Sequence, residues 1–172
     1  MKQLKIVSVG NRVGKTCLHF TTIHGNFPDA YELAVYYNNN YSMTQTVDNK
    51  EYHLQVWDVP CQDDSDDIRP ASLPDADCIL ICYSIENRAS FENILTKWYP
   101  EMKFFAPDAP IILVGMKADL RDPKSGDFVT TEEGKKMKEK IGAFAFVECS
   151  AMKKINLDEV YCQAVRAVEE KK

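Results

Sequence analysis

A short segment that ends in Gly-Lys-Thr has the residue types and the spacing needed to bind phosphate. It spans residues 10–16 and follows an apolar run that is typical of a strand. Glycines let backbone N–H groups wrap round a phosphate, and a helix that begins here adds its positive end. Lys15 is expected to reach the outer phosphates, and the Thr16 hydroxyl to bind Mg²⁺. The residues of this segment that are predicted to bind the ligand are Gly10, Asn11, Arg12, Val13, Gly14, Lys15, Thr16 and Cys17.

This loop departs from the usual pattern in one respect. The pattern G-x-x-x-x-G-K-[ST] has four residues between its glycines, whereas Gly10 and Gly14 are separated by three. The missing residue falls in the part that curves round the β- and γ-phosphates. Arg12, within the loop, could neutralise a phosphate, or it could fill the space that a phosphate or an attacking water needs. An ordinary strand–turn–helix that contains Gly-Lys-Thr by chance is the alternative to a phosphate site.

Two further polar groups follow later apolar runs, at Lys117 to Asp119 and at Ser150-Ala151. An aspartate accepts hydrogen bonds from the N1 and N2 groups of guanine, whereas adenine offers no matching donors. The stem of Lys117 can lie along a purine face, and a backbone amide after Ser150 can donate to guanine O6. Together with the phosphate loop, these residues predict a guanine-nucleotide site.

The elements that must position these residues alternate along the chain. Strands are predicted at 4–9, 41–48, 52–58, 78–84, 110–115 and 144–149, with an Asn49-Lys50 hairpin connection. Helices are predicted from Lys15 to Thr22, from near Ser90, from Thr130 to Gly142 and from about Asn156. This order predicts an α/β fold, a doubly wound and mainly parallel sheet of about six strands with one antiparallel edge strand and helices on both faces. The length of 172 residues predicts a single domain, 1–172.

Composition excludes several classes of function. The net charge of −5 argues against a nucleic-acid-binding surface, and no apolar run approaches the roughly 20 residues of a membrane span. The start of the chain does not resemble a signal peptide, and the six cysteines form no C-x-x-C pair, so we expect reduced thiols in the cytoplasm. Of the three histidines, His24 and His53 are expected at the surface and His19 in a partly buried helix position.

Several longer motifs extend the pattern beyond the site. They are FEN at 91–93, KWYPE at 97–101, PIILVG at 110–115, LRD at 120–122 and ECSA at 148–151. With them the chain resembles the small GTPases of the Ras superfamily, specifically the Rho/Rac subgroup, over essentially all of its length. The resemblance implies that Lys117, Asp119, Ser150 and Ala151 hold guanine and that Phe27 packs against the nucleoside. The family normally has Asn or Thr where Met116 stands, so polar support of the phosphate loop is expected to be weaker.

The resemblance also implies cofactors and partners. GTP or GDP and Mg²⁺ are the expected ligands, with Thr16 and Asp58 at the metal and with Lys15 and Gln62 in catalysis. Protein effectors and regulators are expected on the loops 31–41 and 59–70 of a monomer that regulates the actin cytoskeleton. The chain lacks a C-a-a-X ending, so membrane attachment is expected only if a lipidated tail is missing from it.

Two segments depart from the switches of this family. Ala34 stands where the first switch has a threonine that completes the Mg²⁺ shell, and residues 31–41 contain no Ser or Thr. In the second switch, Cys61 replaces the glycine whose amide meets the γ-phosphate, and Pro60 precedes it. Asp58 and Gln62 are kept. Two functions follow: a signalling GTPase with slow hydrolysis, or a pseudo-GTPase scaffold that does not respond to the γ-phosphate. A P-loop kinase is disfavoured because the guanine motif is present and no lid segment is recognisable.

Overall fold

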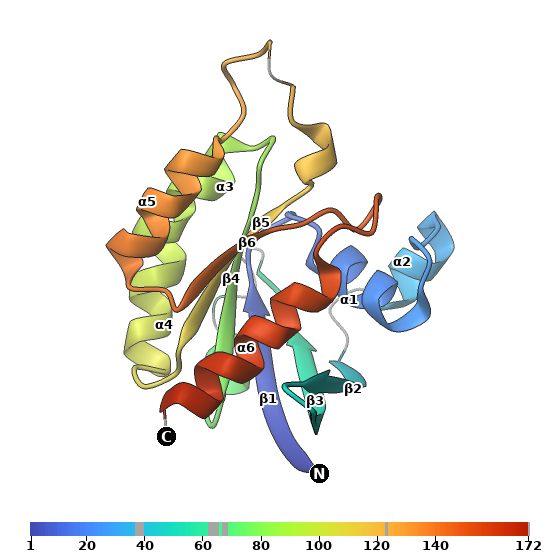
Figure 1. The fold of residues 1–172 in the computed structure, drawn as a ribbon. Coiled ribbons are helices and arrows are strands. Elements are labelled where there is room, and N and C mark those ends of the chain that lie inside the picture. Colours follow the sequence, from blue (N-terminus) through green and yellow to red (C-terminus); the bar gives the residue numbers. More distant parts are fainter. Residues whose placement is uncertain (37–39, 62–65, 67–68, 123, 172) are drawn as a thin grey trace.

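The computed structural model describes residues 1–36, 40–61, 66, 69–122 and 124–171. Within these ranges, six strands form one sheet in the order β2-β3-β1-β4-β5-β6 (Figure 1). They are β1 (Lys2–Val9), β2 (Asn40–Val47), β3 (Lys50–Asp58), β4 (Cys78–Ser84), β5 (Ile111–Met116) and β6 (Ala145–Glu148). Strand β2 pairs antiparallel with β3, and the other neighbours are parallel. The predicted sheet is confirmed, and each predicted strand lies within two residues of the observed bounds.

Helices cover both faces of the sheet. They are α1 (Lys15–His24), α2 (Ala30–Tyr36), α3 (Arg88–Asn93), α4 (Tyr99–Phe105), α5 (Thr131–Ile141) and α6 (Leu157–Lys171), with short helical turns η2 (Arg69–Ser72), η3 (Ile94–Trp98) and η4 (Ala118–Leu120). In Figure 1, α3, α4 and α5 lie on one side of the sheet and α1 and α6 on the other. Every residue of β4 is buried, and its side chains alternate between the two cores: Cys78, Leu80 and Cys82 face one, and Ile79 and Ile81 the other. Burial on both faces explains the continuous apolar run of this strand.

Local turn chemistry sets the ends of several elements. Thr130 and Glu133 form the predicted capping box of α5, and Gly142 ends that helix with φ 64°. The β2–β3 connection is Asp48-Asn49, one residue earlier than the predicted Asn49-Lys50. Both turn residues have positive φ, 50° and 65°, and Asp and Asn accept this conformation more readily than lysine does.

Helix α2 lies in a segment that was predicted from the sequence to be part of a loop. Asp29 caps it: the Glu32 N–H donates to Asp29 Oδ1 at 2.8 Å, and the Leu33 N–H donates to the Asp29 carbonyl at 2.9 Å. The segment Asp-Ala-Tyr-Glu therefore contained a helix-start signal. A second difference concerns α3, which begins at Arg88 rather than near Ser90 because the Asn87 side chain accepts the Ser90 N–H.

His19 is completely buried, which corrects the expectation of a partly buried side chain. One ring nitrogen lies 2.8 Å from Ser8 Oγ on β1 and the other lies 2.6 Å from the Tyr161 hydroxyl on α6. These two partners satisfy both polar atoms of the ring, so burial leaves no hydrogen bond unmade. Burial also lowers the pKa of His19 to about 3. The imidazole is therefore neutral at physiological pH.

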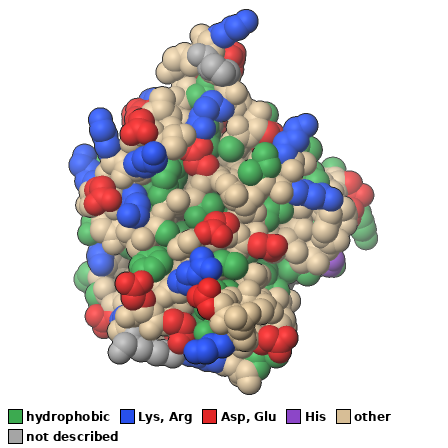
Figure 2. Space-filling view, viewed as in Figure 1, with side chains coloured by type: hydrophobic (Ala, Val, Ile, Leu, Met, Phe, Trp, Pro, Cys, Tyr) green, Lys and Arg blue, Asp and Glu red, His purple; other side chains and the backbone are tan. Residues whose placement is uncertain are grey.

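The surface mixes charges of both signs. On the face drawn in Figure 2, Lys and Arg side chains are interspersed with Asp and Glu side chains. Exposed ion pairs such as Arg166–Asp48, 3.1 Å apart, connect separate elements. In the part of the chain that the structure describes, no helix has the length and apolar character to cross a membrane.

Candidate functional site

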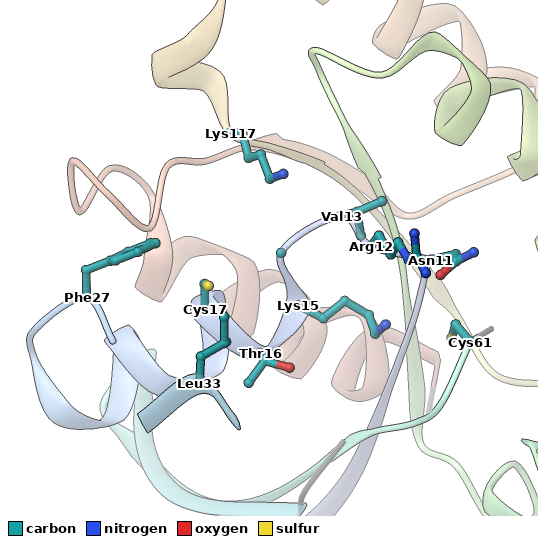
Figure 3. Close-up of a pocket in the computed structure, with 11 residues that line it drawn as sticks. Asn11, Arg12, Val13, Lys15, Thr16, Cys17, Phe27, Leu33, Cys61 and Lys117 are labelled. Carbon is teal, nitrogen blue, oxygen red and sulfur yellow. The ribbon is translucent and has the colours of Figure 1, made fainter. Parts of the chain in front are cut away.

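Two adjoining cavities lie at the carboxyl ends of the strands. The first, of about 320 Å³, is lined by residues 11–17 of the loop between β1 and α1, together with Phe27, Leu33, Cys61 and Lys117 (Figure 3). The second, of about 200 Å³, is lined by Met116, Lys117, Asp119, Leu120, Ala151 and Met152. Four residues, Gly14, Cys17, Phe27 and Lys117, line both cavities. A phosphate-binding end and a base-binding end, predicted separately from the sequence, are therefore parts of one depression.

The backbone of the loop explains its glycines. Gly10 and Gly14 have φ of 140° and 102°, and a Cβ at Gly10 would lie 2.5 Å from the Cys82 carbonyl oxygen. Between them, Arg12 has φ 55°, a left-handed conformation that a non-glycine residue adopts at a cost. The shortened loop thus turns through an arginine, whose exposed side chain lines the first cavity.

Lys15, Thr16 and Asp58 form a buried polar cluster beneath this loop. The Lys15 ammonium donates to the Gly10 carbonyl at 2.5 Å and lies 3.9 Å from Asp58 Oδ1. The Thr16 hydroxyl donates to Asp58 Oδ2. Asp58 is the last residue of β3, so the parallel β1–β3 pairing places it beside the loop. A hydroxyl and a carboxylate are oxygen ligands that suit Mg²⁺, and the pair fits the metal site expected from the sequence.

The two altered switch positions have different surroundings. Ala34 is exposed on α2, and its neighbour Leu33 lines the first cavity. Cys61 is buried, and its Sγ accepts a hydrogen bond from the Gly10 N–H at 3.4 Å. The predicted catalytic Gln62 lies outside the described residues, as do parts of the predicted partner loops at 37–39, 62–65 and 67–68.

Asp119 is held at the edge of the second cavity. Its Oδ1 accepts the Ser150 hydroxyl at 2.7 Å, and Ser150 is itself buried and also accepts the Lys153 N–H at 3.0 Å. Ala151 lines the same cavity. A carboxylate fixed in this way, facing a cavity, is suited to accept the N–H donors of a flat base.

Lys117 and Phe27 border both cavities. Lys117 has φ 62°, and its Cε would lie 3.5 Å from a Cβ placed on Gly14, so its stem packs over the phosphate loop. Its ammonium lies 3.2 Å from Glu86 Oε1. Phe27 is 38% exposed and lies opposite Lys117 in Figure 3. An apolar stem and an aromatic ring on two sides of a slot are suited to contact a purine.

Met116, which stands where a polar residue was expected, is 2% exposed. Its Sδ lies 3.7 Å from Cys149 Sγ, and its methyl group lies 3.8 Å from a Cβ placed on Gly14. Apolar packing between β5, β6 and the phosphate loop therefore replaces a polar side chain here.

The structure also adds residues that the sequence analysis did not single out. Leu33, Leu120 and Met152 line the cavities, and Glu86 pairs with Lys117. No sequence pattern marks Leu33, Leu120 and Met152 as cavity residues, because apolar residues occur wherever a chain packs. Glu86 carried one signal: it lies two residues beyond β4, at the edge of the sheet where ligands bind in this fold class. Three predicted site residues lie behind the cavities and hydrogen-bond to residues that line them: Gly10, Asp58 and Ser150.

Comparison with known proteins gives a consistent picture. The Ras family model matches residues 5–170. The Ras-like GTP-binding protein RhoL of Drosophila melanogaster is 48% identical over 171 residues, which cover 99% of this chain and 89% of that protein. The Ras-like GTP-binding protein RHO1 of Entamoeba histolytica is 42% identical over 168 residues, which cover 97% of this chain and 77% of that protein.

Proposed function

The chain belongs to the Ras family, as a Rho-like small GTPase, and we propose that it binds GDP and GTP with Mg²⁺ and hydrolyses GTP slowly as a signalling switch. One observation carries the proposal. The cavity of the phosphate loop adjoins the cavity of Asp119, and Lys117 and Phe27 line both. A nucleotide needs this arrangement, with anion-binding groups at one end and base-binding groups at the other.

Base selection rests on Asp119. Its carboxylate, held by Ser150, accepts hydrogen bonds from guanine N1–H and the N2 amino group, while adenine presents an acceptor and no amino group at those positions. The Lys117 stem and Phe27 contact the two sides of the nucleoside. Ala151 follows Ser150 and offers its backbone amide to guanine O6.

At the phosphate end, loop N–H groups and the start of α1 bind the phosphates, and Lys15 supplies positive charge. Thr16 and Asp58 are the residues that would hold Mg²⁺, and the charge of the metal would stabilise the phosphate oxygens. Hydrolysis proceeds by in-line attack of water, oriented by Gln62, on the γ-phosphorus. The bond from this phosphorus to the β–γ bridging oxygen breaks, and GDP and inorganic phosphate leave. Arg12 of the shortened loop lines the same cavity, and slow turnover is expected if its side chain fills the space that the attacking water needs.

Protein partners are proposed to contact 31–41 and 59–70. On α2, Tyr31 and Val35 are 78% and 52% exposed and lie one helical turn apart, so they offer apolar surface on the first of these segments. Regulation of the actin cytoskeleton and a monomeric state follow from the Rho-like character alone. In the same way we propose that residues 1–172 form one domain.

A second candidate function is a pseudo-GTPase scaffold. Three features favour it: Ala34 is exposed and has no hydroxyl for a metal, Cys61 occupies the place of a glycine, and the phosphate loop is one residue shorter than the usual pattern. Each alters a group that senses the γ-phosphate or the metal in this family.

Equilibrium titration with fluorescent GDP and ADP in Mg²⁺ tests the main proposal. We expect GDP to bind at least about 100-fold more tightly, because two hydrogen bonds to a carboxylate contribute about 1.5 kcal/mol each. Equal affinities would overturn the assignment of the base site. Single-turnover assays with GTP then separate the two candidates: slow turnover that falls in Gln62→Leu supports the switch, and binding without turnover supports the scaffold.

A further inference from the structure

The Cys61 thiol lies against the first residue of the phosphate loop. Its Sγ accepts the Gly10 N–H at 3.4 Å and donates to the Val59 carbonyl at 3.4 Å, and the residue is only 2% exposed. The Gly10 carbonyl accepts the Lys15 ammonium. Both backbone groups of Gly10 are therefore engaged by side chains that line the first cavity. In Figure 3 the Lys15 side chain extends toward Cys61, across the end of the loop that lies away from Lys117 and Phe27.

The backbone on the amino-terminal side of Cys61 is anchored to the body of the protein. Pro60 has a fixed φ, and its carbonyl accepts Arg69 Nη1 at 3.3 Å. Arg69 is completely buried and makes two hydrogen bonds to Glu101 on α4, of 2.6 and 3.0 Å. The peptide that joins Pro60 to Cys61 is therefore tied to α4 through Arg69 and Glu101. The thiol itself is positioned by its hydrogen bonds to Gly10 and Val59.

The position of the thiol matters for the outermost phosphate. In a bound nucleotide, the loop amides and Lys15 would bind the α- and β-phosphates. A third phosphate would lie further from the base, beyond the Lys15 ammonium and toward Cys61. A thiol is a weak hydrogen-bond donor and presents no positive charge. Burial raises its pKa, so it is the neutral form that lies there. A phosphate at this place would meet a bulky sulfur, whereas a glycine would leave space there and would leave the Gly10 N–H without its sulfur acceptor.

We propose that Cys61 is a specificity-determining residue that makes this site selective for nucleoside diphosphates over triphosphates. The inference rests on the proposed nucleotide site and deepens it. It predicts that the altered second switch changes the relative affinities for nucleoside di- and triphosphates. Equilibrium titration measures these affinities without GTP hydrolysis.

The test compares the affinities of GDP and a non-hydrolysable GTP analogue, with Mg²⁺, in the full chain. The wild type is expected to prefer GDP at least about tenfold, since a weakened phosphate contact costs about 1.4 kcal/mol or more. Cys61→Ala, which removes the sulfur, and Cys61→Gly, which also frees the backbone, are expected to reduce this preference at least about fivefold through tighter binding of the analogue. Cys162→Ala, on α6 and away from the cavities, is the matched control and is expected to keep the wild-type preference.

Three results would overturn the inference. Equal affinity of the wild type for the two nucleotides does so without any variant, and leaves the proposed nucleotide site standing. If Cys61→Ala still binds GDP and keeps the wild-type preference for GDP over the analogue, Cys61 is not the cause of that preference. Failure of the wild type to bind either nucleotide overturns the proposed function and this inference with it.

Discussion

The hydroxyl of Ser150 donates to Asp119 Oδ1 at 2.7 Å across 31 residues of sequence. This bond joins the segments that follow β5 and β6, which are neighbours in the sheet. It orients the carboxylate on which base selection is proposed to depend.

Asp119→Asn is predicted to change the preferred base. The asparagine amide offers one donor and one acceptor, so it matches xanthine, which has a carbonyl in place of the guanine amino group. We expect GDP affinity to fall about 100-fold and xanthosine diphosphate to bind more tightly than GDP. Titration with both nucleotides measures this. Retained preference for GDP would show that Asp119 does not contact the base.

Thr16→Ala is predicted to make the rate of nucleotide release independent of Mg²⁺. If Thr16 and Asp58 hold the metal, chelation of Mg²⁺ should speed GDP release from the wild type by about tenfold or more, because a charge that binds the phosphates is lost. In the variant, release should be fast with and without chelator. Stopped-flow measurement of fluorescent GDP release gives both rates, and Thr44→Ala, on the remote strand β2, is the control. A variant that responds to chelation as the wild type does would contradict the metal assignment.

Glu101→Ala is predicted to destabilise the protein more than Arg69→Met. Arg69 is completely buried, whereas the Glu101 side chain is 16% exposed. Removing Glu101 takes two hydrogen bonds from a buried guanidinium, which keeps Asp66 and the Pro60 carbonyl, and costs about 2 kcal/mol. Replacing Arg69 by an apolar residue of similar size removes the buried charge itself. Urea denaturation measures both free energies of unfolding. The opposite order would show that the ion pair does not anchor the segment before Cys61.

The elements that could be predicted are those whose structure follows from a local sequence pattern. The run at 78–84 is apolar throughout and is the observed β4, and the Thr130–Glu133 box starts α5 as expected. Helix α2 was missed because six of its seven residues are apolar, so its sequence shows no helical period, and only the Asp29 cap marks it. Within the site, loop residues could be identified from spacing. The Gly10–Cys61 and Lys117–Glu86 contacts could not, because tertiary packing alone brings those pairs together.

His19 gives a prediction for the pH dependence of stability. Its folded pKa of about 3 lies below the ordinary value of 6.5. Between these values the unfolded chain binds one more proton at this residue than the folded chain. The free energy of unfolding therefore loses up to about 1.4 kcal/mol per pH unit from this residue as pH falls from 6.5 toward 3.

Urea denaturation of His19→Leu between pH 7 and pH 4 isolates this contribution. The variant should be less stable at pH 7, because Ser8 and Tyr161 each lose a partner, and should have a shallower dependence on pH. His24→Gln, at an exposed position, should keep the wild-type slope. A His19→Leu slope equal to that of the wild type would mean that the imidazole is not held neutral by burial.

Identification of the nucleotide that is bound to the purified protein tests the proposed guanine-nucleotide site. The purified chain is denatured, and the released material is separated by chromatography and quantified against protein. We predict guanine nucleotide, mainly GDP, at about one per chain, as expected for one site. A protein that releases no nucleotide, and that also fails to take up labelled GDP with Mg²⁺, would contradict the account.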